Sequence, residues 1–162
     1  MPIAHGTGER RDGDHWLLHF APHLAEAYET VWQALTTPEG LRGWLAEAEV
    51  LERHLGGAVA LRWLTGPGRL YSGRVTAWDV ERVAEYTLAE HGRIRFHLEP
   101  LGTDSTLIRF TNERQGSEAD LPAGLAGWHE HFLLLESYLS GTPADWPAWT
   151  DTRRTALRTQ YE

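Results

Sequence analysis

Residues 121–141 read LPAGLAGWHEHFLLLESYLSG, and this stretch holds the strongest helical pattern in the chain. Its large apolar residues recur at intervals of four, three, four, three and four positions, which places them on one face of a helix. Pro122 suits the first turn of such a helix, and Gly141 suits its end. We therefore expect a long helix whose apolar face needs a partner surface. That face consists of Leu121, Leu125, Trp128, Phe132, Leu135 and Leu139.

Strand-length segments separated by turn residues precede this helix. The connections between them are too short to hold a crossover helix, so neighbouring strands should pair antiparallel as a meander. Apolar residues alternate along these segments, which predicts a sheet with one dry face. We expect strands over 15–20, 47–54, 58–64, 71–78, 83–90, 92–99 and 106–112. The dry face includes Val59, Leu61, Trp63, Ile94, Phe96, Leu98, Ile108 and Phe110, and the wet face includes Arg62, Arg93, Arg95 and Arg109.

Two short helices are expected between the first and second strands, over 24–35 and 39–46. They are joined by the turn Thr36-Thr37-Pro38, and neither is long enough to be stable without packing on a larger element. The predicted fold class is therefore α+β: a curved antiparallel sheet wrapped around a long C-terminal helix, with two short helices after the first strand.

The length of 162 residues suits one domain with one core. We expect a flexible leader over 1–14, the domain over 15–141, and a tail over 142–162 that packs on the same domain through Trp146 and Trp149. The leader is polar and has no apolar central stretch, unlike a signal peptide, and no apolar run is long enough for a membrane span. We therefore expect a cytoplasmic protein.

The composition excludes several chemistries. The chain has no cysteine, so disulfides, thiolate zinc sites and cysteine nucleophiles are absent. It has no lysine either, which excludes Schiff-base catalysis and a lysine-containing phosphate loop. A formal charge of −8 argues against nucleic acid as a partner, because such binding depends on cationic contacts to phosphate.

The sequence contains no recognisable catalytic or cofactor motif, and we expect neither a cofactor nor a metal. His129 and His131 lie two positions apart, which on a helix directs them about 200° apart, whereas a helical zinc pair is spaced by four residues. His131 should instead lie at the edge of the apolar stripe, beside Leu135, where it can reach the rim of a cavity.

Two segments resemble one family. Residues 31–45, VWQALTTPEGLRGWL, and residues 127–141, GWHEHFLLLESYLSG, resemble the signature regions of the activator of heat-shock-protein-90 ATPase homologues, within the START-like or polyketide-cyclase superfamily. The Gly56-Gly57 turn and the segment 73–75 also lie where that family carries similar residues. The resemblance covers about 16–141 and implies a helix-grip fold with a cavity between the sheet and the long helix. It implies no particular reaction.

We expect this cavity to bind an apolar, polycyclic or aromatic small molecule, because ligand cavities are mostly apolar with a few orienting polar groups. Tyr71 and Arg74 are candidate internal polar groups on one strand. Relatives on this scaffold include proteins that bind or sequester secondary metabolites, including self-resistance proteins of antibiotic producers. The candidate ligand-binding residues are Trp63, Tyr71, Arg74, Phe96, Phe110, Trp128, His131, Phe132 and Leu135.

Two alternatives remain beside the binding protein. The first is an enzyme of the polyketide cyclase or aromatase kind, with Tyr71, Arg74 or His131 as acid or base. The second is a co-chaperone-like interaction protein, as the name of the resembling family implies. The lack of a catalytic pair favours binding, whereas the ligand's identity and the oligomeric state are not encoded in any pattern that we can read.

Overall fold

The computed structural model describes residues 3–162. Within this range nine strands form one antiparallel sheet in the order β1-β2-β9-β8-β7-β6-β5-β4, and β3 also pairs with β9. The predicted meander from β4 to β9 is confirmed. The strands are β1 Thr7–Arg10, β2 His15–Phe20, β3 His23–Leu24, β4 Ala46–Leu51, β5 Ala58–Trp63, β6 Leu70–Asp79, β7 Val83–Leu88, β8 Gly92–Pro100 and β9 Thr106–Gln115.

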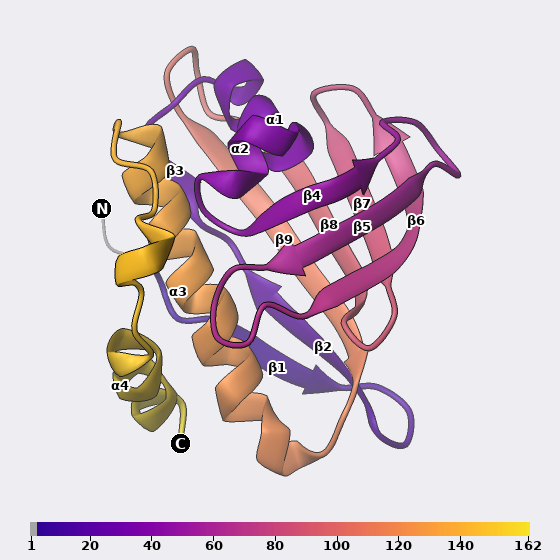
Figure 1. Cartoon of the computed structure of the whole chain (residues 1–162), viewed down its shortest axis with the longest axis vertical. Coiled ribbons are helices and arrows are strands. Elements are labelled where there is room, and N and C mark those ends of the chain that lie inside the picture. Colours follow the sequence, from indigo (N-terminus) through magenta and orange to yellow (C-terminus); the bar gives the residue numbers. More distant parts are fainter. Residues whose placement is uncertain (1–2) are drawn as a thin grey trace.

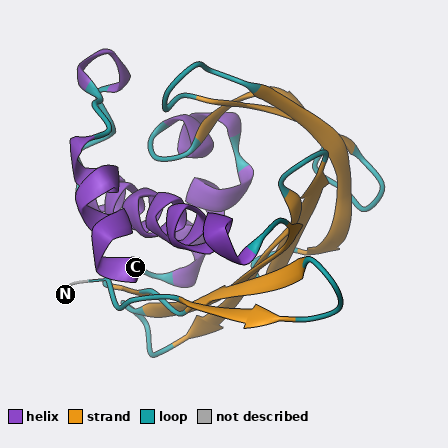
Figure 2. Ribbon diagram, turned by 90° about the horizontal axis from the view of Figure 1, so that it is seen from below, coloured by secondary structure: helices purple, strands orange, loops and turns teal. Residues whose placement is uncertain are grey.

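The sheet curves around the long helix α3, as Figure 2 shows. Helices α1 and α2 cover one end of its concave face, and α4 lies outside α3 (Figure 1). This arrangement confirms the expected α+β helix-grip architecture. The helices are α1 Tyr28–Thr36, α2 Pro38–Arg42, α3 Leu121–Leu139 and α4 Thr152–Tyr161, with short 3₁₀ turns at Glu118–Asp120 and Trp146–Ala148.

Local backbone features help to bend the sheet. The pairing register shifts between Val75 and Ala77 in β6, and again between Ala48 and Val50 in β4. Such bulges increase the twist of a strand. At Gly73 the backbones of β6 and β7 approach so closely that a Cβ would lie 1.8 Å from the carbonyl oxygen of Thr87. The curvature encloses the apolar face and leaves the arginine-rich face outside.

The outer face carries a network of ion pairs. The side chain of Glu85 is only 7% exposed and pairs with Arg95 at 3.0 Å and with Arg93 at 3.7 Å. Arg109 pairs with Glu99 at 2.8 Å. The arginines predicted on the wet face therefore lie there, and they hold neighbouring strands together on the side away from the core.

The N-terminal third differs from expectation in three places. Residues Thr7–Arg10, expected in a flexible leader, form β1 and pair with β2. The first helix begins at Tyr28 and not at Leu24, because Leu24 lies in β3 and pairs with Thr106 of β9. The second helix ends at Arg42, and Ala46 begins β4. Backbone pairing with distant strands prevailed over the local apolar spacing at these positions.

The tail packs on the domain, but through a helix as well as through its tryptophans. Trp146 donates its indole N–H to the carbonyl of Arg42 at 2.7 Å. Beyond it, α4 lies along α3 and covers Glu130, whose side chain is 2% exposed. Arg154 and Arg153 approach the two carboxylate oxygens of Glu130 at 3.3 and 3.6 Å. The second face of α3 is therefore also buried.

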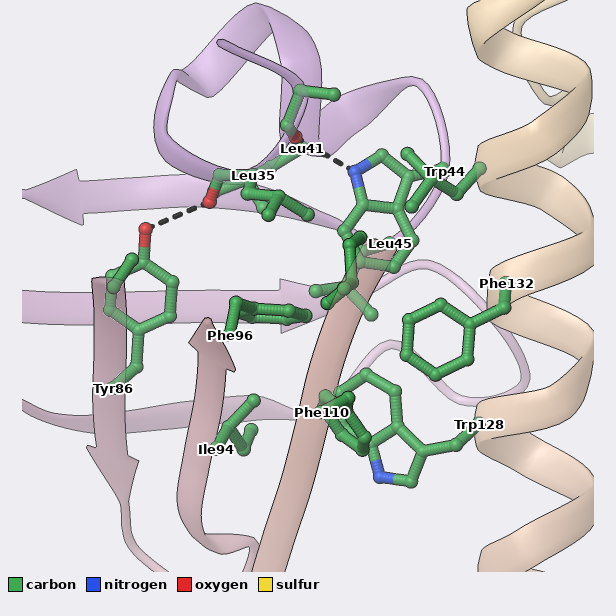
Figure 3. Packing of buried hydrophobic residues seen from close by; sticks show 14 of the residues in the cluster. Leu35, Leu41, Trp44, Leu45, Tyr86, Ile94, Phe96, Phe110, Trp128 and Phe132 are labelled. Atoms are coloured by element: carbon green, nitrogen blue, oxygen red, sulfur yellow. Dashed lines mark hydrogen bonds between the residues drawn. The ribbon is translucent and has the colours of Figure 1, made fainter. Parts of the chain in front are cut away.

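A packed aromatic core fills the interface at the α1–α2 end. Phe132 of α3 stacks on Trp44 with ring centroids 6.2 Å apart and meets Phe110 edge-on at 5.0 Å. Phe96 completes this group beside Phe110, and the hydroxyl of Tyr86 donates to the carbonyl of Leu35 at 2.8 Å (Figure 3). Phe96, Phe110 and Phe132 are each at most 1% exposed, so this half of the interface is filled by side chains.

Candidate ligand pocket

A pocket of about 540 Å³ lies at the other end of the interface, between the N-terminal half of α3, the β5–β6 hairpin and the end of β9. Its size falls in the range of small-molecule sites. Residues distant in sequence form its wall. They are Trp16, Leu18, Trp63, Thr65, Pro67, Arg69, Tyr71, His91, Arg114, Gln115, Gly116, Ser117, Asp120, Leu121, Ala123, Gly124, Gly127, Trp128, His131 and Arg154.

Aromatic rings make one side of the pocket. The imidazole of His91 stacks on Trp63 at 4.5 Å between centroids with an interplanar angle of 24°, and Tyr71 meets the same imidazole edge-on at 4.4 Å. Trp128 stands edge-on to Trp63 at 6.4 Å. Three indoles, those of Trp16, Trp63 and Trp128, line the pocket. Flat apolar surfaces at fixed angles favour a planar aromatic guest.

A buried asparagine fixes part of this wall. Asn112 of β9 is fully buried, and its amide N–H groups donate to the carbonyls of His91 and Arg93 at 2.8 and 3.1 Å. Its side-chain oxygen accepts the indole N–H of Trp128 at 3.1 Å. One polar residue therefore anchors both the turn that carries His91 and the helix residue that faces Trp63, so the aromatic wall is preformed.

His131 is a neutral, deeply buried residue of the wall. It is 2% exposed, and its Nδ1 lies 2.9 Å from the carbonyl oxygen of Trp44. Because a carbonyl only accepts, Nδ1 carries the proton and Nε2 is left as an acceptor. Burial lowers the pKa of His131 to about 3, although the bond to Trp44 opposes this shift. Nε2 has no hydrogen-bond partner among the described residues.

His91 has the same character. Burial, with a smaller contribution from the charge of Arg114, lowers the pKa of His91 to about 4. Its Nδ1 is buried without a hydrogen-bond partner among residues 3–162. Both imidazoles of the pocket are therefore uncharged at neutral pH, and each presents an unpaired ring nitrogen. Buried polar atoms of this kind are uncommon in folded proteins and call for a water molecule or a ligand.

The charged groups of the pocket are mostly cationic. Arg69, Arg114 and Arg154 line it, against the single carboxylate of Asp120. Arg154 is held by Glu130, and the Asp120 carboxylate accepts the backbone N–H and the hydroxyl of Ser117, both at 3.0 Å. The pocket thus has the opposite charge balance to the chain as a whole, whose formal charge is −8.

Part of the helix side of the pocket is open because small residues of α3 lie there. Ala123, Gly124 and Gly127 of α3 face the pocket. A Cβ built at Gly127 would meet no heavy atom within 4 Å, whereas one at Gly124 would lie 3.2 Å from Nη1 of Arg114. Glycine disfavours a helix interior by about 1 kcal/mol relative to alanine. Gly124 and Gly127, on the pocket face of α3, leave space that larger side chains would fill.

The predicted site residues divide into three groups. Trp63, Tyr71, Trp128 and His131 lie together in the pocket wall. Phe96, Phe110, Phe132 and Leu135 do not line this pocket: they belong to the packed core. The placement of Arg74 inside the cavity is wrong, because Arg74 is exposed. In β6 the half-buried Tyr71 and Gly73 and the buried Val75 share the inner parity, so Arg74 must face outward.

Sequence reasoning missed several pocket residues. Arg114 was missed because the predicted strand ended at residue 112, whereas β9 extends to Gln115, and His91 was missed because it lies in the turn between β7 and β8. Arg154 comes from the tail and reaches the pocket only because α4 folds back on α3. A usable signal was present in the helix: Gly124 and Gly127 are spaced by three residues next to Trp128, so they mark a face of α3 that lacks bulk.

Residues 3–162 contain no group of three or more histidine, cysteine, aspartate or glutamate side chains arranged to hold a metal ion. Over the same range, no helix has the length and apolar character needed to cross a membrane.

Comparison with protein families gives one match that spans most of the domain. The family described as activator of Hsp90 ATPase homolog 1-like protein matches residues 27–140. The chain belongs to this family. The match begins after β3 and ends after α3, so Trp16 and Leu18 in β2 and Arg154 in α4 are pocket residues outside the matched region. A comparison with curated proteins finds no match.

Solved structures support the same fold. The crystal structure of CalU16 from Micromonospora echinospora is 19% identical, with a TM-score of 0.71 over 96% of this chain and 91% of that one. The solution structure of the protein encoded by BPP1335 from Bordetella parapertussis is 22% identical, with a TM-score of 0.68 over 99% and 91% of the two chains. At these identities the likeness supports the helix-grip fold alone and carries nothing about the ligand.

Proposed function

We propose that this protein binds a planar aromatic or polycyclic small molecule, of the kind common among secondary metabolites, in the pocket beside the N-terminal half of α3. The observation that carries the proposal is the pairing of a wall that holds three indoles, of which Trp128 is fixed by Asn112, with a helix face that has no side chains at Gly124 and Gly127. Members of the family commonly bind hydrophobic ligands, which agrees with this function.

The lining of the pocket is not purely apolar. The pocket is lined by arginines and by two neutral imidazoles as well as by indoles. An entirely apolar guest would leave these groups without partners, at an energetic cost. The pocket therefore suits an aromatic ring system that also carries polar substituents.

An acid–base enzyme is less well supported by this pocket. Arg74, one of the three candidate catalytic groups, is exposed, and His131 has a pKa of about 3. A general base works best with a pKa near the operating pH, so a strongly lowered pKa makes His131 a poor proton acceptor at pH 7. Tyr71 is the remaining candidate. Recovery of the bound molecule unchanged after long incubation distinguishes binding from turnover.

The proposal can be tested with a substitution that fills the pocket without disturbing the fold. In Gly127→Leu the new side chain extends into open space, and the loss of a helix glycine removes an unfavourable helix propensity. Ser137→Leu adds the same atoms to an exposed position of the same helix and serves as the matched control. The probes are naphthalene-2-carboxamide and naphthalene-2-carboxylate, followed by calorimetry and by tryptophan fluorescence.

We expect at least one probe to bind the unmodified protein and the Ser137→Leu protein with equal affinity. Gly127→Leu should weaken that binding at least tenfold while its melting temperature stays equal or rises. Association should also show a negative heat-capacity change, the marker of apolar burial. Binding that survives Gly127→Leu unchanged would place the guest elsewhere, and the absence of binding by both probes would contradict the proposed function.

A further inference from the structure

Arg114 is the partly buried cation of the pocket that has no partner among residues 3–162, whereas Arg69, which also lacks one, is exposed to solvent. Among residues 3–162, no hydrogen bond or ion pair to its guanidinium is found, in contrast to Arg154, which is held by Glu130 at 3.3 Å. The carboxylate of Asp120 acts electrostatically on Arg114, yet its hydrogen bonds go to the backbone N–H and the hydroxyl of Ser117. The guanidinium is therefore available.

The position of Arg114 is fixed by the fold. It follows the inward-facing Asn112 by two positions at the end of β9, so it has the same parity and faces α3. Its Nη1 lies against the bare backbone of Gly124, where a Cβ would be 3.2 Å away. Burial lowers the pKa of Arg114, which reports a guanidinium partly removed from water. Such a group binds an anion more strongly than a solvated arginine does.

The charged neighbour of Arg114 is Asp120, whose carboxylate attracts the guanidinium but makes its hydrogen bonds to Ser117. Asp120, His91 and Tyr71 are the titratable groups that act on it or on which it acts. His91 is neutral at pH 7 and stacks on Trp63, so an aromatic surface lies beside the free cation. A planar ring on that surface brings an acidic substituent within reach of Arg114.

We propose, resting on the function proposed above, that the physiological ligand is an aromatic acid whose anionic oxygen, a carboxylate or a phenolate, binds the guanidinium of Arg114 while its ring lies against Trp63 and Trp128. Arg114 then acts as the specificity-determining residue that selects acids over neutral aromatic molecules. The unpaired nitrogens of His91 and His131 remain available for hydrogen bonds to other polar groups of the guest or to water.

The experiment compares two probes of equal shape. Naphthalene-2-carboxylate carries the anion, and naphthalene-2-carboxamide has the same ring without the charge. Their affinities are measured by calorimetry for the unmodified protein, Arg114→Gln, Arg114→Lys and Arg109→Gln. Arg109 is the matched control, because it lies in the same strand but is exposed on the outer face, where it pairs with Glu99.

The unmodified protein should bind the carboxylate about ten- to a hundredfold more tightly than the amide, as expected for hydrogen bonds to a charged group. Arg114→Gln should abolish this preference and leave amide binding within about twofold, a result that also demonstrates an intact pocket. Arg114→Lys should retain part of the preference, because it keeps the charge but loses the planar fork. Arg109→Gln should retain all of it.

The preference should also be constant between pH 5.5 and 8, since arginine does not titrate there and both histidines of the pocket stay neutral. A preference that increases as the pH falls would assign the anion to a protonated histidine and overturn the proposal. Equal affinity for the two probes, with both blocked by Gly127→Leu, would also overturn it while leaving the binding function intact. Failure of both probes to bind would contradict the two proposals together.

Discussion

The two ends of the interface between α3 and the sheet are built from the same elements but differ in packing: one is filled by side chains and the other holds a pocket. At the α1–α2 end, Phe132 and Leu135 of α3 are completely buried against Trp44 and the aromatic residues of β8 and β9. At the other end, α3 presents Gly124 and Gly127, and a pocket of about 540 Å³ opens beneath them. The same helix over the same sheet thus gives a packed core at one end and a pocket at the other.

This difference teaches that the size of the helix residues, and not the curvature of the sheet alone, determines where space is left. The sheet curves around one side of α3 (Figure 2). Where α1 supplies Leu35 and the turn after α2 supplies Trp44, the space is filled, as close-packed protein interiors require. Beyond their reach the β5–β6 hairpin, β2 and the end of β9 approach the helix, and among the described residues they leave the pocket open.

The largest effect expected from the comparison concerns the packed end. Phe132→Ala should lower the free energy of unfolding by about 3 to 5 kcal/mol, because it removes a fully buried aromatic ring and leaves a cavity. Leu121→Ala, on the same helix at the open end, should cost about 1 kcal/mol or less, since Leu121 is only partly buried. Denaturant melts of both variants measure the two values. Equal costs would mean that the two ends do not differ in packing.

The second effect comes from the neutral histidine beside the pocket. His91 has a pKa of about 4 when folded and near 6.5 when unfolded, so between these values the unfolded chain binds a proton that the folded chain does not. Its contribution to stability is complete above pH 6.5 and is lost as the pH falls toward 4. Between pH 7 and 5 the loss is about 2 kcal/mol.

His91→Phe keeps an aromatic ring against Trp63 and removes this titration. The decrease in unfolding free energy between pH 7 and pH 5 should therefore shrink by about 2 kcal/mol. His97→Phe, on the exposed face of β8, should leave the decrease as it is in the unmodified protein. A His91→Phe protein with an unchanged pH profile would show that His91 is not buried in its neutral form.

The smallest effect distinguishes two glycines of one helix. Gly127→Ala should stabilise the protein by about 0.5 to 1 kcal/mol, because its Cβ enters open space and a helix glycine is lost. Gly124→Ala should gain less or nothing, since its Cβ would press on Arg114 and on Leu18 at 3.2 and 3.4 Å. Thermal melts of both variants give the difference. A larger gain for Gly124→Ala would mean that Arg114 does not lie against that turn.

The main elements of the fold could be predicted from the spacing of apolar residues within single segments of the sequence. The spacing of Leu125, Trp128 and Phe132 predicted α3 with its bounds correct to within two residues, and the alternation in β5, β8 and β9 predicted the dry face of the sheet. The apolar spacing over residues 24–35 predicted a helix that begins four residues too early. Leu24 instead pairs through its backbone with Thr106, in a strand more than eighty residues away. Local apolar spacing cannot report such a partner.

The sequence by itself determined the periodicities, and with them the α+β class, the antiparallel sheet and its covering helix, since these depend on how side chains alternate along one segment. Only the tertiary structure decided which aromatic residues fill the core and which line the pocket. That choice depends on what each ring faces: Phe132 faces Trp44 and is buried in the core, whereas Trp128, one turn earlier, adjoins the space left by Gly127. The position of Arg114 also depends on the tertiary structure, because the end of β9 packs against Gly124 of α3.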